Sequence, residues 1–223
     1  MFNKKMTVVH ISEVLATGIL EFILMLTQNI QDCHHVVIYK AKNLPEFDND
    51  LDALFPSHVT TIKWKNIARP MNLINDSKAA VELYGLLKNI NPDLVHLHSS
   101  KAGFLGRIVS PFIVGKRPII YTPNGASFAR TDVSKFKKTF FKACEYSANL
   151  LSGNVVCVSS SEAQLYKDIG IKAFHINNGS NINPPLKESD QTVFNVVTSG
   201  RVTNQKNPSL FNKIAQHFEG HKN

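Results

Sequence analysis

Short β-branched runs alternate with longer amphipathic stretches along the first 179 residues of the chain. The runs have the apolar composition of buried parallel strands and lie at residues 6–11, 36–39, 59–63, 94–98, 118–121, 154–158 and 172–176. The stretches between them predict helices at residues 19–30, 44–55, 71–89, 104–109, 133–151 and 159–168. This strict alternation predicts an α/β fold with a Rossmann-like, doubly wound parallel sheet.

A polar, proline-containing segment interrupts the alternation at residues 180–191. After it, Phe194 belongs to another β-rich run and Pro208 opens another helical pattern. We therefore predict a first domain at residues 1–179, an interdomain linker at 180–191 and the incomplete start of a second Rossmann-like domain at 192–223. A single strand-helix unit cannot bury a core of its own, so this last piece would be marginal alone.

Composition and charge narrow the class of partner. Of the 223 residues, 43% are hydrophobic and 19% are charged, which is typical of a globular protein, and the formal net charge is +8. Such a charge favours an anionic partner: nucleic acid, anionic lipid or a phosphorylated substrate. Nucleic acid is the least expected of these, because the basic residues form no recognition motif with aromatic residues.

The cysteines and the apolar segments indicate the compartment. The three cysteines are far apart in the sequence, which favours a reducing cytosol and argues against a disulfide framework or a cysteine zinc site. The most apolar stretch, residues 19–26, contains Glu21 and is far shorter than the roughly 20 residues that a bilayer crossing needs. We expect a cytoplasmic protein, either free or peripheral at the inner face of the cytoplasmic membrane.

Polar loops follow four of the predicted strands, at the edge of an open α/β sheet where ligands bind. Gly18 precedes a helix whose amides could meet a phosphate, although a plain tight turn is an equal interpretation. His98, Ser99 and Lys101 follow another strand and are placed to contact a ligand. Asn124 stands at the tip of a third loop, where it would position a substrate by hydrogen bonds or form a structural Asx turn.

Two histidines alternate on the strand at residues 94–98. We expect the side chains of His96 and His98 to face opposite sides of the sheet, with His96 in the core, so we predict no metal pair here. No metal site is predicted elsewhere in the chain.

The helix at residues 133–151 has one face that is apolar at helical spacing and is predicted to be core; it carries Phe136, Phe140, Ala143, Cys144, Ser147, Leu150 and Leu151. On the other side, Phe141 lies among lysines that include Lys138 and Lys142. An aromatic residue among lysines is typical of a helix that binds anionic lipid. A solvated face is the alternative.

The stretch from Phe194 to Pro208 predicts an anion site. A β-rich run ends at Gly200, Arg201 and Lys206 follow, and a helix begins at Pro208. Backbone amides at a strand-to-helix turn, together with two cations, are suited to a phosphate or a diphosphate.

Four segments, in the order in which they occur along the chain, together resemble the family-4 glycosyltransferases of bacterial surface polysaccharide synthesis. Residues 92–107 are similar to the family's acceptor-domain signature, and residues 121–128 to its strand-end Thr-Pro-His-Gly segment. Residues 177–179 resemble the Asn-Gly turn before the interdomain linker, and residues 200–208 resemble the donor-phosphate loop.

The resemblance implies a GT-B fold, in which an acceptor domain and a nucleotide-sugar domain face each other. It implies transfer with retention of configuration, from a nucleotide-sugar donor to a glycan or lipid-linked acceptor in capsule, lipopolysaccharide or exopolysaccharide synthesis. No cofactor or essential metal is expected. Arg201 and Lys206 would hold the donor diphosphate with Gly18 nearby, and His98, Ser99 and Lys101 would lie on the acceptor side.

Two departures from the family pattern change these expectations. Asn124 stands where the family has histidine, so the group near the transferred sugar cannot take up a proton. The paired glutamates of the second domain would lie beyond Asn223, so we expect this chain to be inactive by itself. A nucleotide-sugar 2-epimerase of GT-B fold and a non-catalytic glycolipid-binding or assembly domain are the alternatives.

Overall fold

A computed structural model describes residues 5–40, 51–68, 71–179, 196–198, 200, 202 and 207–218. The chain divides into two compact units, Met1–Ser180 and Asn181–Asn223, which are considered separately. Several predicted features lie outside the described residues: the linker at 180–191, most of the helix at 44–55, the start of the β-rich run at 194, and the cations Arg201 and Lys206.

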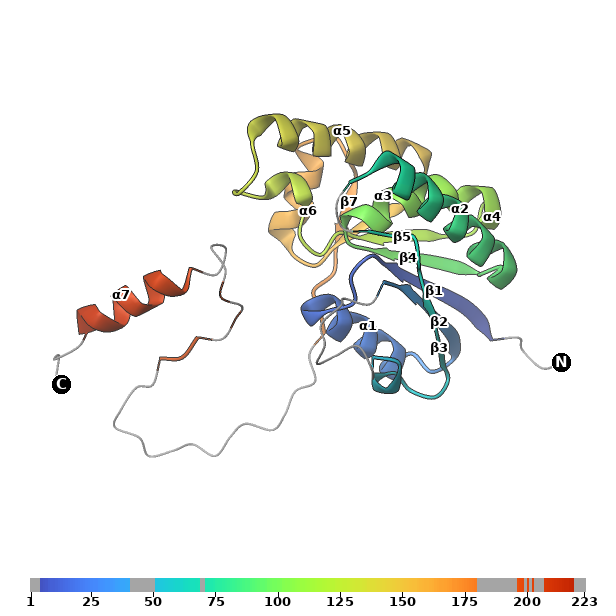
Figure 1. Cartoon of the computed structure of the whole chain (residues 1–223), viewed down its shortest axis with the longest axis horizontal. Helices are drawn as coiled ribbons and strands as arrows, with labels where there is room; N and C mark the ends of the chain where they lie inside the picture. Colours follow the sequence, from blue (N-terminus) through green and yellow to red (C-terminus); the bar gives the residue numbers. More distant parts are fainter. Residues whose placement is uncertain are drawn as a thin grey trace. The chain divides into compact units, whose positions relative to one another are not determined.

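The first unit is built on a seven-stranded parallel sheet with the order β3-β2-β1-β4-β5-β6-β7 (Figure 1). The strands are β1 (Met6–Ser12), β2 (Cys33–Tyr39), β3 (Val59–Lys63), β4 (Leu94–His98), β5 (Ile119–Thr122), β6 (Asn154–Cys157) and β7 (Ala173–His175). The chain starts in the middle of the sheet, builds one half outward to β3, and then returns beside β1 to build the other half. This doubly wound order confirms the predicted Rossmann-like α/β fold.

The helices of the first unit are α1 (Thr17–Asn29), α2 (Leu73–Ile90), α3 (Ser100–Val109), α4 (Pro111–Val114), α5 (Lys135–Leu151) and α6 (Ser160–Lys167), with short 3₁₀ turns η1 (Asp52–Leu54) and η2 (Ser127–Ala129). In Figure 1, α1 lies on one side of the sheet and α2, α3 and α5 lie on the other.

Two predictions need correction. Gly18 belongs to the first turn of α1 instead of a tight turn, and the helix predicted at 104–109 begins at Ser100.

Two apolar cores fill the space between the helices and the sheet. The larger one joins Val9 and Leu97 of the sheet to side chains of α2 and α3, such as Leu83 and Leu105. The smaller one lies on the opposite face, where Val37 packs with residues such as Ile23 of α1. Adjacent positions of a strand point to opposite faces, which is why neighbours in β2 contribute to different cores.

A buried ion pair fixes how α5 lies on the larger core. Arg107 of α3 and Glu145 of α5 are 2.6 Å apart, and both side chains are almost fully buried. Tyr121 of β5 donates a hydrogen bond to the same carboxylate at 2.9 Å, and the Arg107 guanidinium lies 4.1 Å from the centre of the Tyr121 ring. The Glu145 side of α5 therefore faces inward, and the opposite side faces outward.

In the second unit, the described residues contain one helix, α7 (Pro208–Phe218), which confirms that Pro208 opens a helix. No helix among the described residues is long and apolar enough to cross a membrane.

Candidate functional site

The loops that follow β1, β4 and β5 meet at one edge of the sheet. Ser12 pairs with His98, and His98 pairs with Thr122, so the three strands end at the same level. The backbone N–H of Ser99 donates to the carbonyl of Thr122 at 3.1 Å, which joins the second loop to the third. The structure therefore brings Ser99 and Asn124 onto neighbouring loops, as expected for the carboxyl ends of parallel strands.

Glu13, which sequence reasoning missed, organises the first two of these loops. Its carboxylate accepts a hydrogen bond from the Ser99 hydroxyl, and accepts backbone N–H bonds from Ala102 at 2.9 Å and Lys101 at 3.3 Å. Those amides belong to the first turn of α3, where a negative charge is stabilised by the helix dipole. The amides that could have bound a substrate anion are thus already satisfied by the chain itself.

Lys101, predicted on the acceptor side, is tied to α2 and its preceding segment. Its ammonium lies 2.6 Å from a carboxylate oxygen of Asp76 and donates to the carbonyl of Ala68 at 2.6 Å. The charge of Lys101 is therefore largely used inside the protein, and its contribution to an acceptor site would be indirect.

Ser99 holds an uncommon backbone conformation, with φ +66° and ψ 169°. Glycine is normally required there, and a residue with a side chain persists only when its surroundings enforce the conformation, at a cost of about 1–3 kcal/mol. Here the bond to Thr122 and the bond to Glu13 enforce it. Strain of this kind tends to occur at functional sites, and a role of Ser99 on the acceptor side stays a prediction.

Asn124 also has a positive φ, +54°, and its side-chain amide donates to the carbonyl of Thr122 at 3.3 Å. The next residue, Gly125, donates its N–H to Glu162 of α6 at 2.8 Å. Glu162 itself belongs to the first turn of α6, where its own N–H donates to the hydroxyl of the N-cap Ser159 at 3.1 Å. Glu162 therefore holds the Asn124 turn against α6. The Ser-x-x-Glu pattern was the available signal for it.

Gly18 is the second residue of α1, a helix without an acidic residue in its first turn and with Ala16 as its N-cap. A side chain added at Gly18 would meet nothing within 4 Å, so the backbone is open at this point. These features suit the approach of an anion to the first amides of α1. Binding of a donor phosphate there stays a prediction.

The expectation for the two histidines of β4 was wrong. Side chains two positions apart on a strand point to the same face, so His96 and His98 lie together, with ring centres 4.0 Å apart. Both face α1, where Phe22 stands edge-on to each ring. His98 is 0% exposed. The prediction that its ring reaches the acceptor side of the loop was therefore wrong.

The prediction for α5 also needs correction. The side expected to be core is exposed, and we call the exposed residues Phe136, Phe140, Ala143, Leu150 and Leu151 the apolar α5 face. Phe141, predicted to face a membrane beside Lys138 and Lys142, is partly buried against the larger core. The cause is the buried ion pair, which turns Glu145 inward and so places the opposite side of the helix outside.

The sequence model of Glycosyltransferase Family 4 matches residues 16–183, which is well over half of the chain. The chain belongs to Glycosyltransferase Family 4. The match runs from the N-terminus of α1 past the end of β7, so it contains the loops that carry Ser99 and Asn124.

Among known members and neighbours, the UDP-Gal:alpha-D-GlcNAc-diphosphoundecaprenol alpha-1,3-galactosyltransferase of Escherichia coli is 30% identical over 174 residues, covering 68% of this chain and 43% of that protein. A lipopolysaccharide outer core galactosyltransferase in its apo form has a TM-score of 0.57 at 14% identity, covering 82% of this chain and 50% of that one. The UDP-N-acetylglucosamine 2-epimerase of Rickettsia bellii has a TM-score of 0.56 at 11% identity, covering 78% and 45%.

The share of each relative that this chain spans limits what the comparisons support. The chain spans less than half the length of the Escherichia coli relative. The two solved structures are too distant in sequence to indicate more than a shared fold, so the epimerase likeness is architectural. The family match and the galactosyltransferase relative support a transferase, in agreement with the predicted family.

Proposed function

We propose that the first unit is the acceptor-binding part of a retaining glycosyltransferase of bacterial capsule, lipopolysaccharide or exopolysaccharide synthesis. The observation that carries this proposal is the strained Ser99 loop beside the Asn124 turn, at the carboxyl edge of a sheet that belongs to Family 4. The donor is a nucleotide sugar and the acceptor is a glycan or a lipid-linked sugar. The name of the Escherichia coli relative, which includes a diphosphoundecaprenol-linked sugar, supports the lipid-linked class.

In this proposal, Asn124 is a positioning group. An amide can donate one hydrogen bond and accept another but does not exchange a proton near neutral pH. Its turn is held on one side by Thr122 and on the other by Glu162. The side chain is therefore suited to orient a sugar hydroxyl at the edge of the sheet.

The donor diphosphate would meet positive charge without a metal. The amides at the start of α1, next to Gly18, are open to a phosphate and carry partial positive charge. Groups of this kind stabilise the charge that develops on a leaving diphosphate.

The apolar α5 face would bring the enzyme to its lipid-linked acceptor at the inner face of the cytoplasmic membrane. Phe136 is 83% exposed and Leu150 is 70% exposed. At 100° per residue, exposed lysines flank this face, with Lys137 on one side and Lys135 and Lys142 on the other. An apolar stripe between lysines is suited to the interface of an anionic bilayer.

The test is binding of the purified chain to nanodiscs that carry N-acetylglucosamine linked through diphosphate to a polyprenol. We expect binding above that of matched discs without this lipid, and a loss of the difference when Asn124 is replaced by alanine. Equal binding to both kinds of disc by the folded wild-type chain would contradict the acceptor assignment.

A further inference from the structure

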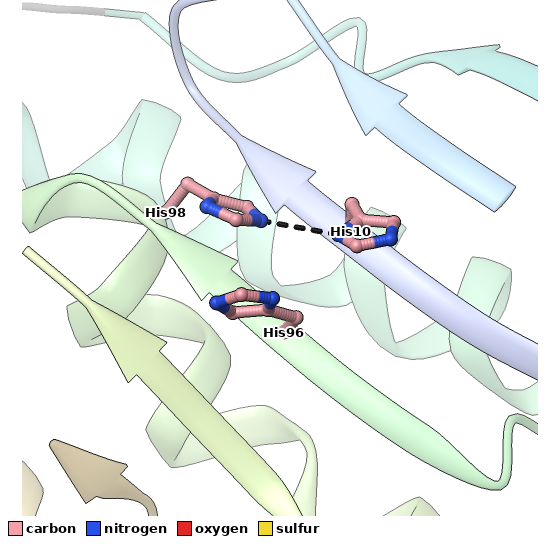
Figure 2. Close-up of side chains that lie close together, drawn as sticks. All are labelled: His10, His96 and His98. Carbon is pink, nitrogen blue, oxygen red and sulfur yellow. Dashed lines mark hydrogen bonds between the residues drawn. The ribbon is translucent and has the colours of Figure 1, made fainter. Parts of the chain in front are cut away.

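Three histidines from two strands converge in the middle of the sheet. His10 of β1 and His96 of β4 are directly paired in the parallel register, and His98 lies two positions further along the same face. One ring nitrogen of each lies within 4.8 Å of those of the other two. Figure 2 shows the three rings turned toward a common space between the strands.

The proton positions in this cluster follow from one backbone carbonyl. The Ile30 carbonyl can only accept, so the Nε2 of His35 that lies 2.7 Å from it carries the proton. In the neutral ring, Nδ1 of His35 then accepts from Nε2 of His10 at 3.1 Å. By the same rule, Nδ1 of His10 has a free lone pair and accepts from Nε2 of His98 at 3.2 Å.

The rings are neutral, which is the form that binds metals. Burial lowers the pKa of His10 and His98 well below the ordinary value, and lowers the pKa of His96 to about 4. A neutral imidazole is the commonest protein ligand for zinc and related ions.

We propose that His10, His96 and His98 form a binding site for a zinc-type transition-metal ion. With a metal–nitrogen distance of 2.0–2.1 Å, two ligands of a tetrahedral ion are roughly 3.3 Å apart. The Nδ1 of His10 and the Nε2 of His98 already stand 3.2 Å apart. His96 completes the set, because one of its ring nitrogens lies within 4.8 Å of the ligand atoms of the other two histidines.

The outer contacts that orient metal ligands are also present. The other nitrogen of His10 bonds to His35, and the Nε2 of His96 lies 2.9 Å from the hydroxyl of Thr122. The Nδ1 of His98 is buried and has no hydrogen-bond partner among the described residues. When Nε2 of His98 binds the ion, its proton moves to this free Nδ1, so the ring stays neutral.

The face of the sheet that carries the cluster becomes more exposed toward β7. His96 pairs with Ile120 of β5, and the same face of the sheet also carries Val156 of β6 and its partner Phe174 of β7. These side chains are less buried than the histidines, and Phe174 is largely exposed. Three neutral ligands leave a fourth position, which water or an anion can fill.

Isothermal titration of the EDTA-treated, untagged chain with zinc chloride tests the site. We expect one zinc ion per chain in the wild type and loss of this binding in His96→Ala. His35→Asn, which removes only an outer contact, should keep one site with about 10–100-fold lower affinity. His34→Ala and His175→Ala remove exposed histidines and serve as controls that should bind like wild type.

A second measurement does not depend on the folding of a variant. Cobalt(II) bound to the wild-type chain should give the visible absorption of a tetrahedral site, and one equivalent of zinc should abolish it. An octahedral cobalt spectrum in the wild type, or unchanged zinc binding in folded His96→Ala, would overturn the proposal. The inference is independent of the proposed transfer reaction, for which no metal is expected.

Discussion

Glu13 and Ser99, which are 86 positions apart in the sequence, are joined by a hydrogen bond from the serine hydroxyl to the carboxylate. The bond closes the end of β1 onto the start of α3, and it holds Ser99 in a conformation that glycine normally adopts.

The strain at Ser99 can be separated from its hydrogen bond by two substitutions. Ser99→Ala loses the bond to Glu13 but keeps a Cβ in the strained conformation, whereas Ser99→Gly loses the bond and relieves the strain. We expect the glycine variant to have a free energy of unfolding about 1–3 kcal/mol higher than the alanine variant, as measured by urea titration. Equal stability of the two variants would mean that the backbone at residue 99 is relaxed.

The N-cap of α6 predicts that stability and acceptor binding can be changed separately. Ser159→Ala should lower the free energy of unfolding by about 0.5–2 kcal/mol, because a helix loses its N-cap, while acceptor binding is kept. Glu162→Ala should lower stability by a similar amount and also weaken binding to the acceptor nanodiscs, because the Gly125 amide beside Asn124 loses its partner. The idea that Glu162 positions the Asn124 turn fails if the folded Glu162→Ala chain binds the acceptor like Ser159→Ala.

The buried ion pair predicts a large loss of stability when one of its two charges is removed. Glu145→Ala leaves the guanidinium of Arg107 without its carboxylate in the core, and we expect a loss of about 3–5 kcal/mol in the free energy of unfolding. Arg130 and Asp132 form an ion pair that is largely exposed, so Arg130→Ala is the matched control and should change the unfolding midpoint little. A small effect of Glu145→Ala would show that the core readily hydrates Arg107.

The apolar α5 face predicts which residues bind lipid. Exchanging both Phe136 and Leu150 for serine should strongly reduce co-flotation with liposomes that contain phosphatidylglycerol, because the exposed apolar stripe is lost. Leu73→Ser, which changes an 88% exposed leucine on α2, is the control. Flotation of the wild type should also weaken with salt, since exposed lysines contribute to it. If the double variant and the control float alike, α5 does not face the membrane.

The strand and helix order was predictable because each element has a local pattern. What the sequence did not show is how the patterns face one another. The helix α5 has phenylalanines on one side and a polar residue on the other, and this pattern suggested that the phenylalanines were buried. The structure instead buries Glu145, because Arg107 of α3 supplies its counter-charge. A partner so far away in the sequence cannot be identified from the helix alone.

The histidine cluster shows a second kind of limit. The shared face of His96 and His98 followed from the two-residue period of a strand, and our expectation to the contrary misapplied that rule. The third member, His10, depends on the register between β1 and β4, which sequence spacing does not fix. Glu13 was missed for a related reason, since its partners are brought to it by the same strand pairing.

The capped end of α3 has a consequence for how a charged substrate lies on the sheet. Two helices, α1 and α3, start at the same edge, and each start carries partial positive charge. At α3 the carboxylate of Glu13 cancels that charge, whereas α1 has no acid in its first turn. Of these two ends, therefore, we expect only α1 to attract a diphosphate. If the proposed function is right, a molecule with a charged and a neutral part should lie with its phosphates toward Gly18 and its sugar toward Ser99 and Asn124.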